Sequence, residues 1–184
     1  MKELLEIFYN NRCETTSDIN EHVPTLKKFA EECEHITEMG VRAAVSTFGF
    51  LMGKPKKLIS IDIEPLENFG NETEVIRQIA NENGIEFEFR LGSTLGMEIE
   101  ETDLLFVDTD HTYHQVSNEL RLHGNKAKKY IIFHDTTKFE FSGMNGDTIG
   151  IWPAITDFIK QNPHWELYLR YYNNNGLTII RRKW

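Results

Sequence analysis

The stretch over residues 35–62 most constrains how this chain can fold, because its pattern passes from strand to helix and back to strand. Residues 36–39 form a short run of strand length, and a glycine turn leads into a helix predicted over residues 43–52. A Gly-Lys-Pro tripeptide at residues 53–55 ends that helix, and residues 57–63 form a second, apolar run. The stretch therefore predicts a βαβ unit and a parallel sheet.

The turn in this unit could hold a nucleotide. Gly40 stands where the first strand turns towards the helix, a junction that creates a crevice in parallel α/β sheets. Asp62 ends the next strand, where a carboxylate can accept hydrogen bonds from ribose hydroxyls. One glycine turn is equally compatible with an ordinary βαβ unit that binds no ligand, so this stretch alone leaves both interpretations open.

The remaining chain continues the alternation of strands and helices and ends in a hairpin signal, Asn173 to Gly176. We expect one domain over residues 1–184, with N-terminal helices in residues 1–34 and an α/β core in residues 35–184. Further helices are predicted over residues 1–10, 21–34, 73–83, 112–124 and 149–161, and further strands over residues 85–91, 103–108, 128–134, 165–172 and 177–182.

Composition excludes several classes of partner. Twenty basic and 29 acidic residues give a net charge of −9, which repels a nucleic-acid backbone. The two cysteines, Cys13 and Cys33, form no metal-binding motif and suit a reducing compartment. The N-terminus lacks a signal-peptide core, and no apolar run approaches the roughly 20 residues of a membrane span. We therefore expect a cytoplasmic protein that binds neither nucleic acid nor membrane.

Polar residues gather after the predicted parallel strands. They occupy residues 40–47, 62–64, 92–93, 108–111 and 134–136, whereas the strand interiors are nearly all apolar. Ligands bind at the carboxyl ends of the strands in open α/β sheets. Agreement across several loops is stronger evidence for a ligand site than any single motif.

These loops carry motifs of a known family. After the strands stand E-x-G-x-x-x-x-x-S-T, SIDI, GS, LLFVDTDHTYHQV and IIFHDT, which together span residues 36–136. The chain resembles class I S-adenosylmethionine (SAM)-dependent methyltransferases, in the small-molecule and sugar O-methyltransferase branch that contains cephalosporin-hydroxylase-like proteins. The resemblance implies an α/β, Rossmann-like, doubly wound fold: a mostly parallel seven-stranded sheet that ends in an antiparallel β-hairpin, with helices on both faces.

The resemblance also implies which residues contact the cofactor. Residues of the first loop would line the methionine part, the acid after the second strand would bind the ribose, and the serine after the third would neighbour the adenine. Ala44 departs from the family pattern, in which a glycine lets the backbone approach the cofactor. The implied SAM-binding residues are Glu38, Gly40, Ser46, Thr47, Asp62, Ser93 and Asp108.

The implied catalytic residues are His111 and Asp108, with His111 as the general base that removes the proton of the acceptor hydroxyl. Metal-dependent members of the branch hold a divalent ion through acids at the positions of Asp108, His134 and Asp135. In this chain His134 replaces one expected acid. Mg²⁺ prefers oxygen ligands, so an imidazole at this position suits Mg²⁺ less well than the expected acid.

The implied reaction is O-methylation of a small, carbohydrate-like acceptor. Asn145 and Asp147 are candidate acceptor contacts, and the N-terminal helices and the hairpin offer surfaces for a homo-oligomer. Two alternatives stay open: a lyase or hydrolase that consumes SAM without an acceptor, and a non-catalytic binding module whose cofactor loop is degraded at Ala44.

Overall fold

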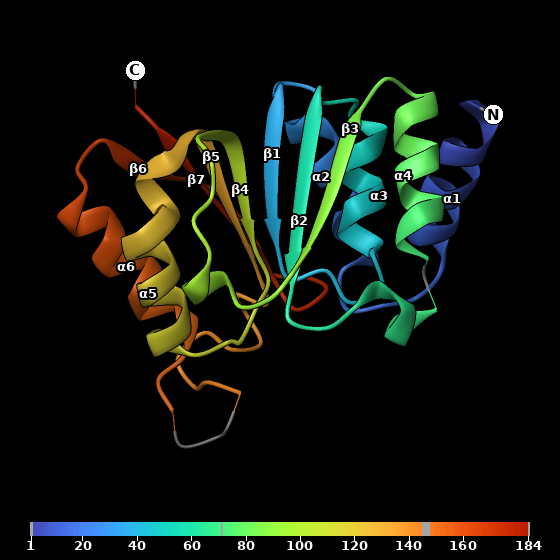
Figure 1. The fold of residues 1–184 in the computed structure, drawn as a ribbon. Helices are drawn as coiled ribbons and strands as arrows, with labels where there is room; N and C mark the ends of the chain where they lie inside the picture. Colours follow the sequence, from blue (N-terminus) through green and yellow to red (C-terminus); the bar gives the residue numbers. More distant parts are fainter. Residues whose placement is uncertain (1, 71, 145–147, 184) are drawn as a thin grey trace. The chain divides into compact units, whose positions relative to one another are not determined.

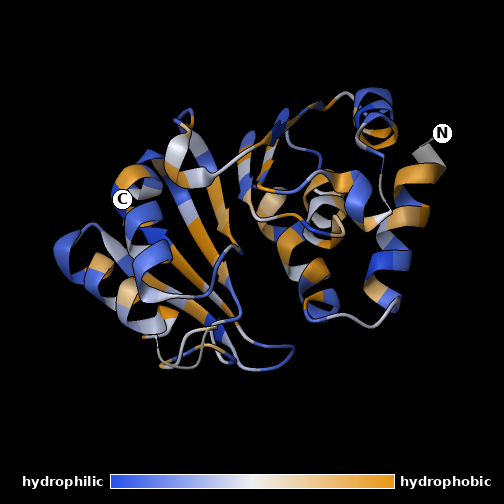
Figure 2. Cartoon of the chain, turned by 60° about the horizontal axis from the view of Figure 1, so that its bottom comes forward, coloured by the Kyte–Doolittle hydropathy of each residue, from blue (hydrophilic) through white to orange (hydrophobic). Residues whose placement is uncertain are grey.

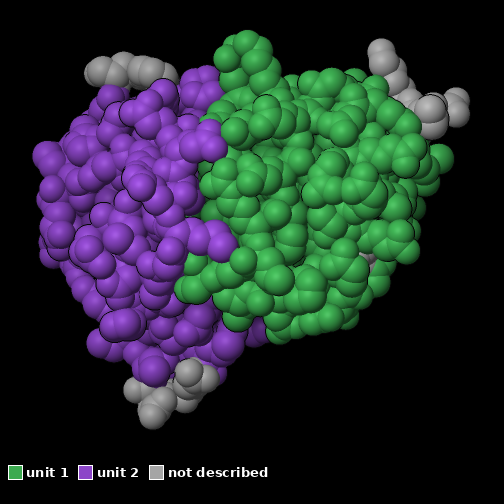
Figure 3. Space-filling view, in the orientation of Figure 1, with its two compact units in different colours: residues 1–94 green, residues 95–184 purple. Residues whose placement is uncertain are grey.

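The computed structural model describes residues 2–70, 72–144 and 148–183. The chain divides into two compact units, residues 1–94 and residues 95–184 (Figure 3). In each unit hydrophobic segments run along the strands, and hydrophilic segments cover the outer turns of the helices (Figure 2). None of the helices in the described ranges is long and apolar enough to cross a membrane.

Unit 1 contains three parallel strands in the order β3-β2-β1. Glu38 on β1 pairs with Ser60 on β2, so their side chains project from the same face of the sheet. The elements that form unit 1 (Figure 1) are α1 (Lys2–Glu14), a 3₁₀ turn (Asn20–His22), α2 (Val23–Ala30), β1 (His35–Met39), α3 (Val45–Met52), β2 (Lys57–Asp62), a second 3₁₀ turn (Leu66–Phe69), α4 (Thr73–Glu82) and β3 (Glu86–Leu91).

Close helix packing completes unit 1. The Phe8 ring of α1 stacks on Phe48 of α3, with ring centroids 4.8 Å apart. A side chain at Gly53 would overlap Ala30 at the end of α2, so only glycine fits there. The glycine that ends α3 therefore also lets α2 approach it.

Unit 2 contains four strands in the order β4-β5-β7-β6. β4 and β5 are parallel, whereas β7 pairs antiparallel with both β5 and β6. Helices α5 and α6 lie side by side (Figure 1). The elements that form unit 2 are β4 (Thr102–Val107), α5 (Tyr113–His123), a 3₁₀ turn (Gly124–Lys126), β5 (Ala127–His134), α6 (Ile151–Gln161), β6 (Trp165–Tyr171) and β7 (Leu177–Arg182).

The described residues thus contain seven strands, mostly parallel, with the predicted terminal antiparallel hairpin, and this part of the fold prediction is confirmed. Three helices start two residues later than predicted, and one of them, expected over residues 149–161, is α6, which begins at Ile151. The helix expected over residues 21–34 is α2, which begins at Val23 with Pro24 in its first turn, where a missing N–H costs nothing. The helix expected from residue 43 begins at Val45, because Arg42 and Ala44 adopt left-handed backbone conformations.

Candidate active site

The loop after β1 has an unusual backbone. Gly40, Arg42 and Ala44 have φ angles of +84°, +45° and +54°. Residues with a Cβ pay a cost in this left-handed region, and only glycine adopts it freely. Alternation between left- and right-handed residues turns successive N–H groups to the same side, which creates a concave site for an anion.

That site holds the carboxylate of Asp62. Its Oδ2 accepts hydrogen bonds from the N–H groups of Val41 at 2.7 Å and Arg42 at 3.0 Å, and its Oδ1 accepts from the N–H of Glu64 at 3.0 Å. A carboxylate can accept about four hydrogen bonds, so capacity remains for a ligand hydroxyl. The structure therefore brings Gly40 and Asp62 to one loop cluster, as the sequence predicts.

Glu38 lies beneath this loop and is completely buried. Its carboxylate accepts hydrogen bonds from the hydroxyls of Ser46 at 2.5 Å, Thr47 at 2.9 Å and Ser60 at 2.5 Å. Three of the predicted cofactor residues thus bind one another. Sequence reasoning missed Ser60, although its place on β2 opposite Glu38 in the parallel register could have suggested the contact.

The loop after β3 also contacts the end of β2. The N–H of Gly92 donates to the carbonyl of Asp62 at 2.7 Å, and the next residue, Ser93, is exposed. Ser93 therefore stands on the surface of unit 1, beyond the carboxyl end of β3.

Unit 2 brings two acids and two histidines together. Asp108 and His111 follow β4, and His134 and Asp135 stand at the end of β5, which is parallel to β4. Nε2 of His111 lies 3.1 Å from Asp108 Oδ1 and 2.9 Å from Asp135 Oδ2. Nδ1 of His134 lies 3.3 Å and 3.8 Å from the same two oxygens. We refer to these four residues as the His–Asp cluster.

Neighbouring groups fix both imidazoles. The ring of Phe139 stacks on His111 with centroids 4.8 Å apart and an interplanar angle of 13°. The backbone carbonyl of Asn174, in the hairpin turn, lies 3.2 Å from Nε2 of His134. Neither contact could be predicted from the sequence, because both come from distant segments, the loop after β5 and the β6–β7 turn.

Charges set the protonation of the cluster. Burial opposes the charge of His111, but hydrogen bonds to Asp108 and Asp135 and their negative charges outweigh it and raise its pKa to about 9. Burial also opposes the charge of His134, and the charge of Asp108 outweighs it and raises the pKa of His134 to about 9. Burial alone would raise the pKa of Asp108, but the charge of His134 and hydrogen bonds from both rings hold that pKa well below its usual range. The two acids therefore require positive charge beside them.

The cluster has the spacing of a metal site. Donor atoms of Asp108, His111 and Asp135 all lie within 4.8 Å of one another. Two buried atoms, Asp135 Oδ1 and His111 Nδ1, have no hydrogen-bond partner among the described residues. Asp135 also has a left-handed backbone, with φ of +59°, a costly conformation that gathers at functional sites. A cation would satisfy the acids that the two rings now share.

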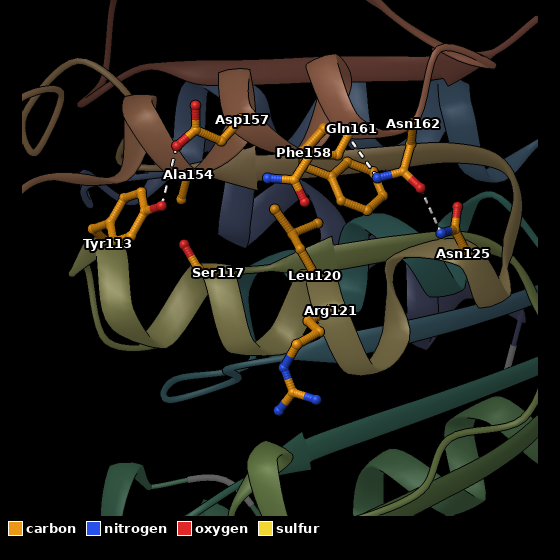
Figure 4. Close-up of a pocket in the computed structure, with 10 residues that line it drawn as sticks. All are labelled: Tyr113, Ser117, Leu120, Arg121, Asn125, Ala154, Asp157, Phe158, Gln161 and Asn162. Carbon is orange, nitrogen blue, oxygen red and sulfur yellow. Dashed lines mark hydrogen bonds between the residues drawn. The ribbon is translucent and has the colours of Figure 1, made fainter.

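Other candidates lie elsewhere. His114 is exposed on α5, and Asn145 and Asp147 lie outside the described residues. A cavity of about 340 Å³ beside the His111 loop is lined by Asp110, Thr112, Tyr113, His114, Thr148 and Ile149. A second cavity, of about 410 Å³, lies between α5 and α6, where Tyr113 donates to Asp157 at 3.1 Å (Figure 4). No residue of the His–Asp cluster is among the described residues that line either cavity.

Solved structures share this fold. An O-methyltransferase from Bacillus cereus in complex with S-adenosylhomocysteine (SAH) is 16% identical with a TM-score of 0.68, and the match covers 98% of this chain and 91% of that one. A protein from Corynebacterium glutamicum is 12% identical with a TM-score of 0.71, over 99% and 90% of the two chains. The O-methyltransferase TomG from Streptomyces achromogenes, in complex with SAM and involved in tomaymycin synthesis, is 14% identical with a TM-score of 0.63, over 92% and 82%.

These likenesses show that the chain has the Rossmann-like fold of class I O-methyltransferases, and the predicted fold class is confirmed. No protein-family model and no curated protein matches the sequence.

Proposed function

We propose that the protein is an enzyme that uses SAM to O-methylate a hydroxyl group of a small molecule. The observation that carries this proposal is the Asp62 carboxylate held by the N–H groups of Val41 and Arg42 at the carboxyl end of β2. A carboxylate in that place suits two neighbouring ribose hydroxyls. Structures of the same fold are bound to SAH and SAM, which supports a nucleoside of this kind.

Unit 1 supplies the nucleoside contacts. Gly40 gives the backbone room beside the methionine part of the cofactor, and Asp62 accepts from the ribose hydroxyls. Ser93 neighbours the adenine. Glu38, with Ser46 and Thr47, supports the loop from beneath by means of its three hydroxyl contacts. Asp108, which the resemblance implies as a further cofactor contact, belongs to unit 2.

His111 is the proposed general base, with Asp108 as its partner. In the reaction an acceptor oxygen attacks the methyl carbon, the bond from that carbon to sulfur breaks, and sulfur keeps the electron pair as a thioether. The hydroxyl proton passes to the imidazole of His111. This role requires a neutral imidazole, which positive charge beside Asp108 and Asp135 would favour.

The acceptor class follows from the resemblance to sugar O-methyltransferases, which suggests a small, carbohydrate-like polyol. The cavity of about 340 Å³ beside the His111 loop is large enough for a small acceptor of this kind.

A divalent metal is also implied by the resemblance, with Asp108, His134 and Asp135 as ligands. The two acids fit Mg²⁺, but His134 offers a nitrogen where Mg²⁺ prefers oxygen. The donor set therefore disagrees with Mg²⁺, and no step of the proposed reaction depends on it.

Mass spectrometry of the purified protein with SAM tests the proposed function. With a panel of sugars and polyols, we expect one acceptor to gain the mass of one CH₂ group, about 14 Da, while SAH forms. His111→Ala should retain nucleoside binding and lose at least about 100-fold in turnover. Release of methylthioadenosine without an acceptor would contradict methyl transfer and support a SAM-consuming lyase.

A further inference from the structure

We propose that Asp108, His134 and Asp135 bind a first-row transition-metal dication such as Zn²⁺ in preference to Mg²⁺. The three ligand atoms are Oδ1 of Asp108, Oδ2 of Asp135 and Nδ1 of His134, all in unit 2. Three protein ligands with the remaining positions open is the usual arrangement of a catalytic metal site. The nearest other donor is Nε2 of His111, which lies 2.9–3.1 Å from both carboxylate oxygens.

The tautomer of His134 supports a ligand role. Its Nε2 lies 3.2 Å from the carbonyl oxygen of Asn174, which can only accept a hydrogen bond, so Nε2 carries a hydrogen. In the neutral ring Nδ1 then carries the lone pair, and Nδ1 is the atom that faces the two acids. A metal-binding histidine usually donates its other N–H to a carbonyl or a carboxylate, which fixes the ring in this way.

Asp135 supplies an independent observation. Its side chain is 6% exposed, yet Oδ1 has no hydrogen-bond partner among the described residues. A buried carboxylate oxygen without a partner is costly. An ion bound at Oδ2 lies close enough to Oδ1 to compensate its charge, whereas the histidine contacts alone leave Oδ1 unsatisfied.

The distances agree with a single ion. Ligand atoms about 2.1 Å from one metal at tetrahedral angles lie about 3.4 Å from one another. Nδ1 of His134 lies 3.3 Å from Asp108 Oδ1 and 3.8 Å from Asp135 Oδ2. Small side-chain rotations would therefore suffice to place one ion between the three atoms.

The ligand types decide which metal is preferred. Mg²⁺ binds oxygen almost exclusively and keeps its water, whereas imidazole nitrogen suits Zn²⁺, Co²⁺, Ni²⁺ and Fe²⁺. Asp108 and Asp135 alone would accept either group of ions. His134 is therefore the residue that shifts the preference towards a transition metal.

Equilibrium dialysis with metal analysis tests this proposal without any measurement of activity. Purified, metal-stripped protein should bind one equivalent of Zn²⁺ at least about 100-fold more tightly than Mg²⁺. Co²⁺ should give visible absorption bands that shift when His134 is changed to Gln. NMR of the ring nitrogens should show that Zn²⁺ perturbs Nδ1 of His134 and leaves its Nε2 protonated.

Variants distinguish this site from adventitious binding. His134→Gln and Asp135→Asn should each weaken Zn²⁺ at least about tenfold, whereas the exposed His164→Gln should not. His134→Asp should reduce the preference for Zn²⁺, because the affinity for Mg²⁺ should rise relative to the affinity for Zn²⁺. The proposal is overturned if Mg²⁺ binds the wild type within tenfold of Zn²⁺ (about 1.4 kcal/mol), or if Zn²⁺ binding survives both ligand variants. These results do not depend on SAM, so they can fail or succeed separately from the proposed methyl transfer.

Discussion

The backbone N–H of Val41 donates a hydrogen bond of 2.7 Å to the carboxylate of Asp62, 21 residues further along the chain. This bond joins the loop after β1 to the end of β2 and fixes the carboxylate that we assign to ribose binding. The N–H of Arg42 adds a second bond to the same oxygen at 3.0 Å. The residue that would recognise the nucleoside therefore also holds the loop that surrounds it.

Asp62→Asn should weaken both nucleoside binding and the attachment of the loop after β1. The amide oxygen can replace only one carboxylate oxygen, so the NH₂ group would face either the loop N–H groups or that of Glu64. We expect the free energy of unfolding to fall by about 1–3 kcal/mol, measured by urea denaturation. An unchanged stability would show that these backbone bonds contribute little.

Glu38→Gln should destabilise unit 1. The buried carboxylate now accepts from three hydroxyls, and an amide would turn a donor towards at least one of them. The expected loss is about 1–3 kcal/mol, again by urea denaturation. Glu74→Gln, at a side chain 79% exposed on α4, is the matched control and should change stability by less than about 0.5 kcal/mol. Equal effects of the two changes would contradict the buried role of Glu38.

Substitutions at Ala44 test the left-handed loop. Ala44→Gly relieves backbone strain but removes a fully buried methyl group, and the two effects of about 1 kcal/mol each should nearly cancel. Ala44→Val places a β-branched residue at a φ of +54° and should cost at least about 2 kcal/mol. Differential scanning calorimetry of the three proteins would show this order. A valine variant as stable as the wild type would rule out the left-handed conformation.

Stability without metal should fall as the pH rises from neutrality. The folded pKa values of His111 and His134, about 9, exceed the unfolded value of 6.5. Their contribution is therefore fully present below pH 6.5 and is lost as the pH rises through 9, by an amount on the order of 3 kcal/mol for each histidine. Urea denaturation at a series of pH values measures this loss.

The control for this pH dependence is the double variant His111→Gln, His134→Gln, which should show a flatter profile. The lowered pKa of Asp108 has the opposite sign, because its contribution is present above the unfolded pKa and disappears as the pH falls into the acid range. A wild-type profile as flat as that of the double variant would contradict the charge pairing in the cluster.

Much of this arrangement could be predicted from local patterns. Gly40 and Asp62 stand at a turn and a strand end, which periodicity locates, and parallel strands bring such ends to one edge. The Ala44 departure from glycine already marked the position whose backbone proves to be left-handed. The strand and hairpin assignments were confirmed for the same reason, since apolar runs and turn residues are local signals.

Contacts between distant segments could not be predicted. The stack of Phe139 on His111 and the carbonyl of Asn174 beside His134 depend on how loops close in three dimensions. The engagement of Ser46 and Thr47 by Glu38 likewise depends on side-chain direction within a buried space. The carbohydrate-like acceptor, the base role of His111 and the single-domain organisation stay predictions.

Isothermal titration of the purified protein with SAH tests the central claim most directly. The account predicts saturable binding of one equivalent at tens of micromolar protein, and at least about tenfold weaker binding by Asp62→Ala, since a carboxylate that accepts from both ribose hydroxyls is lost. Circular dichroism should first show that both proteins are folded. The absence of any binding heat from folded wild-type protein would contradict the proposal that this protein is a SAM-dependent methyltransferase.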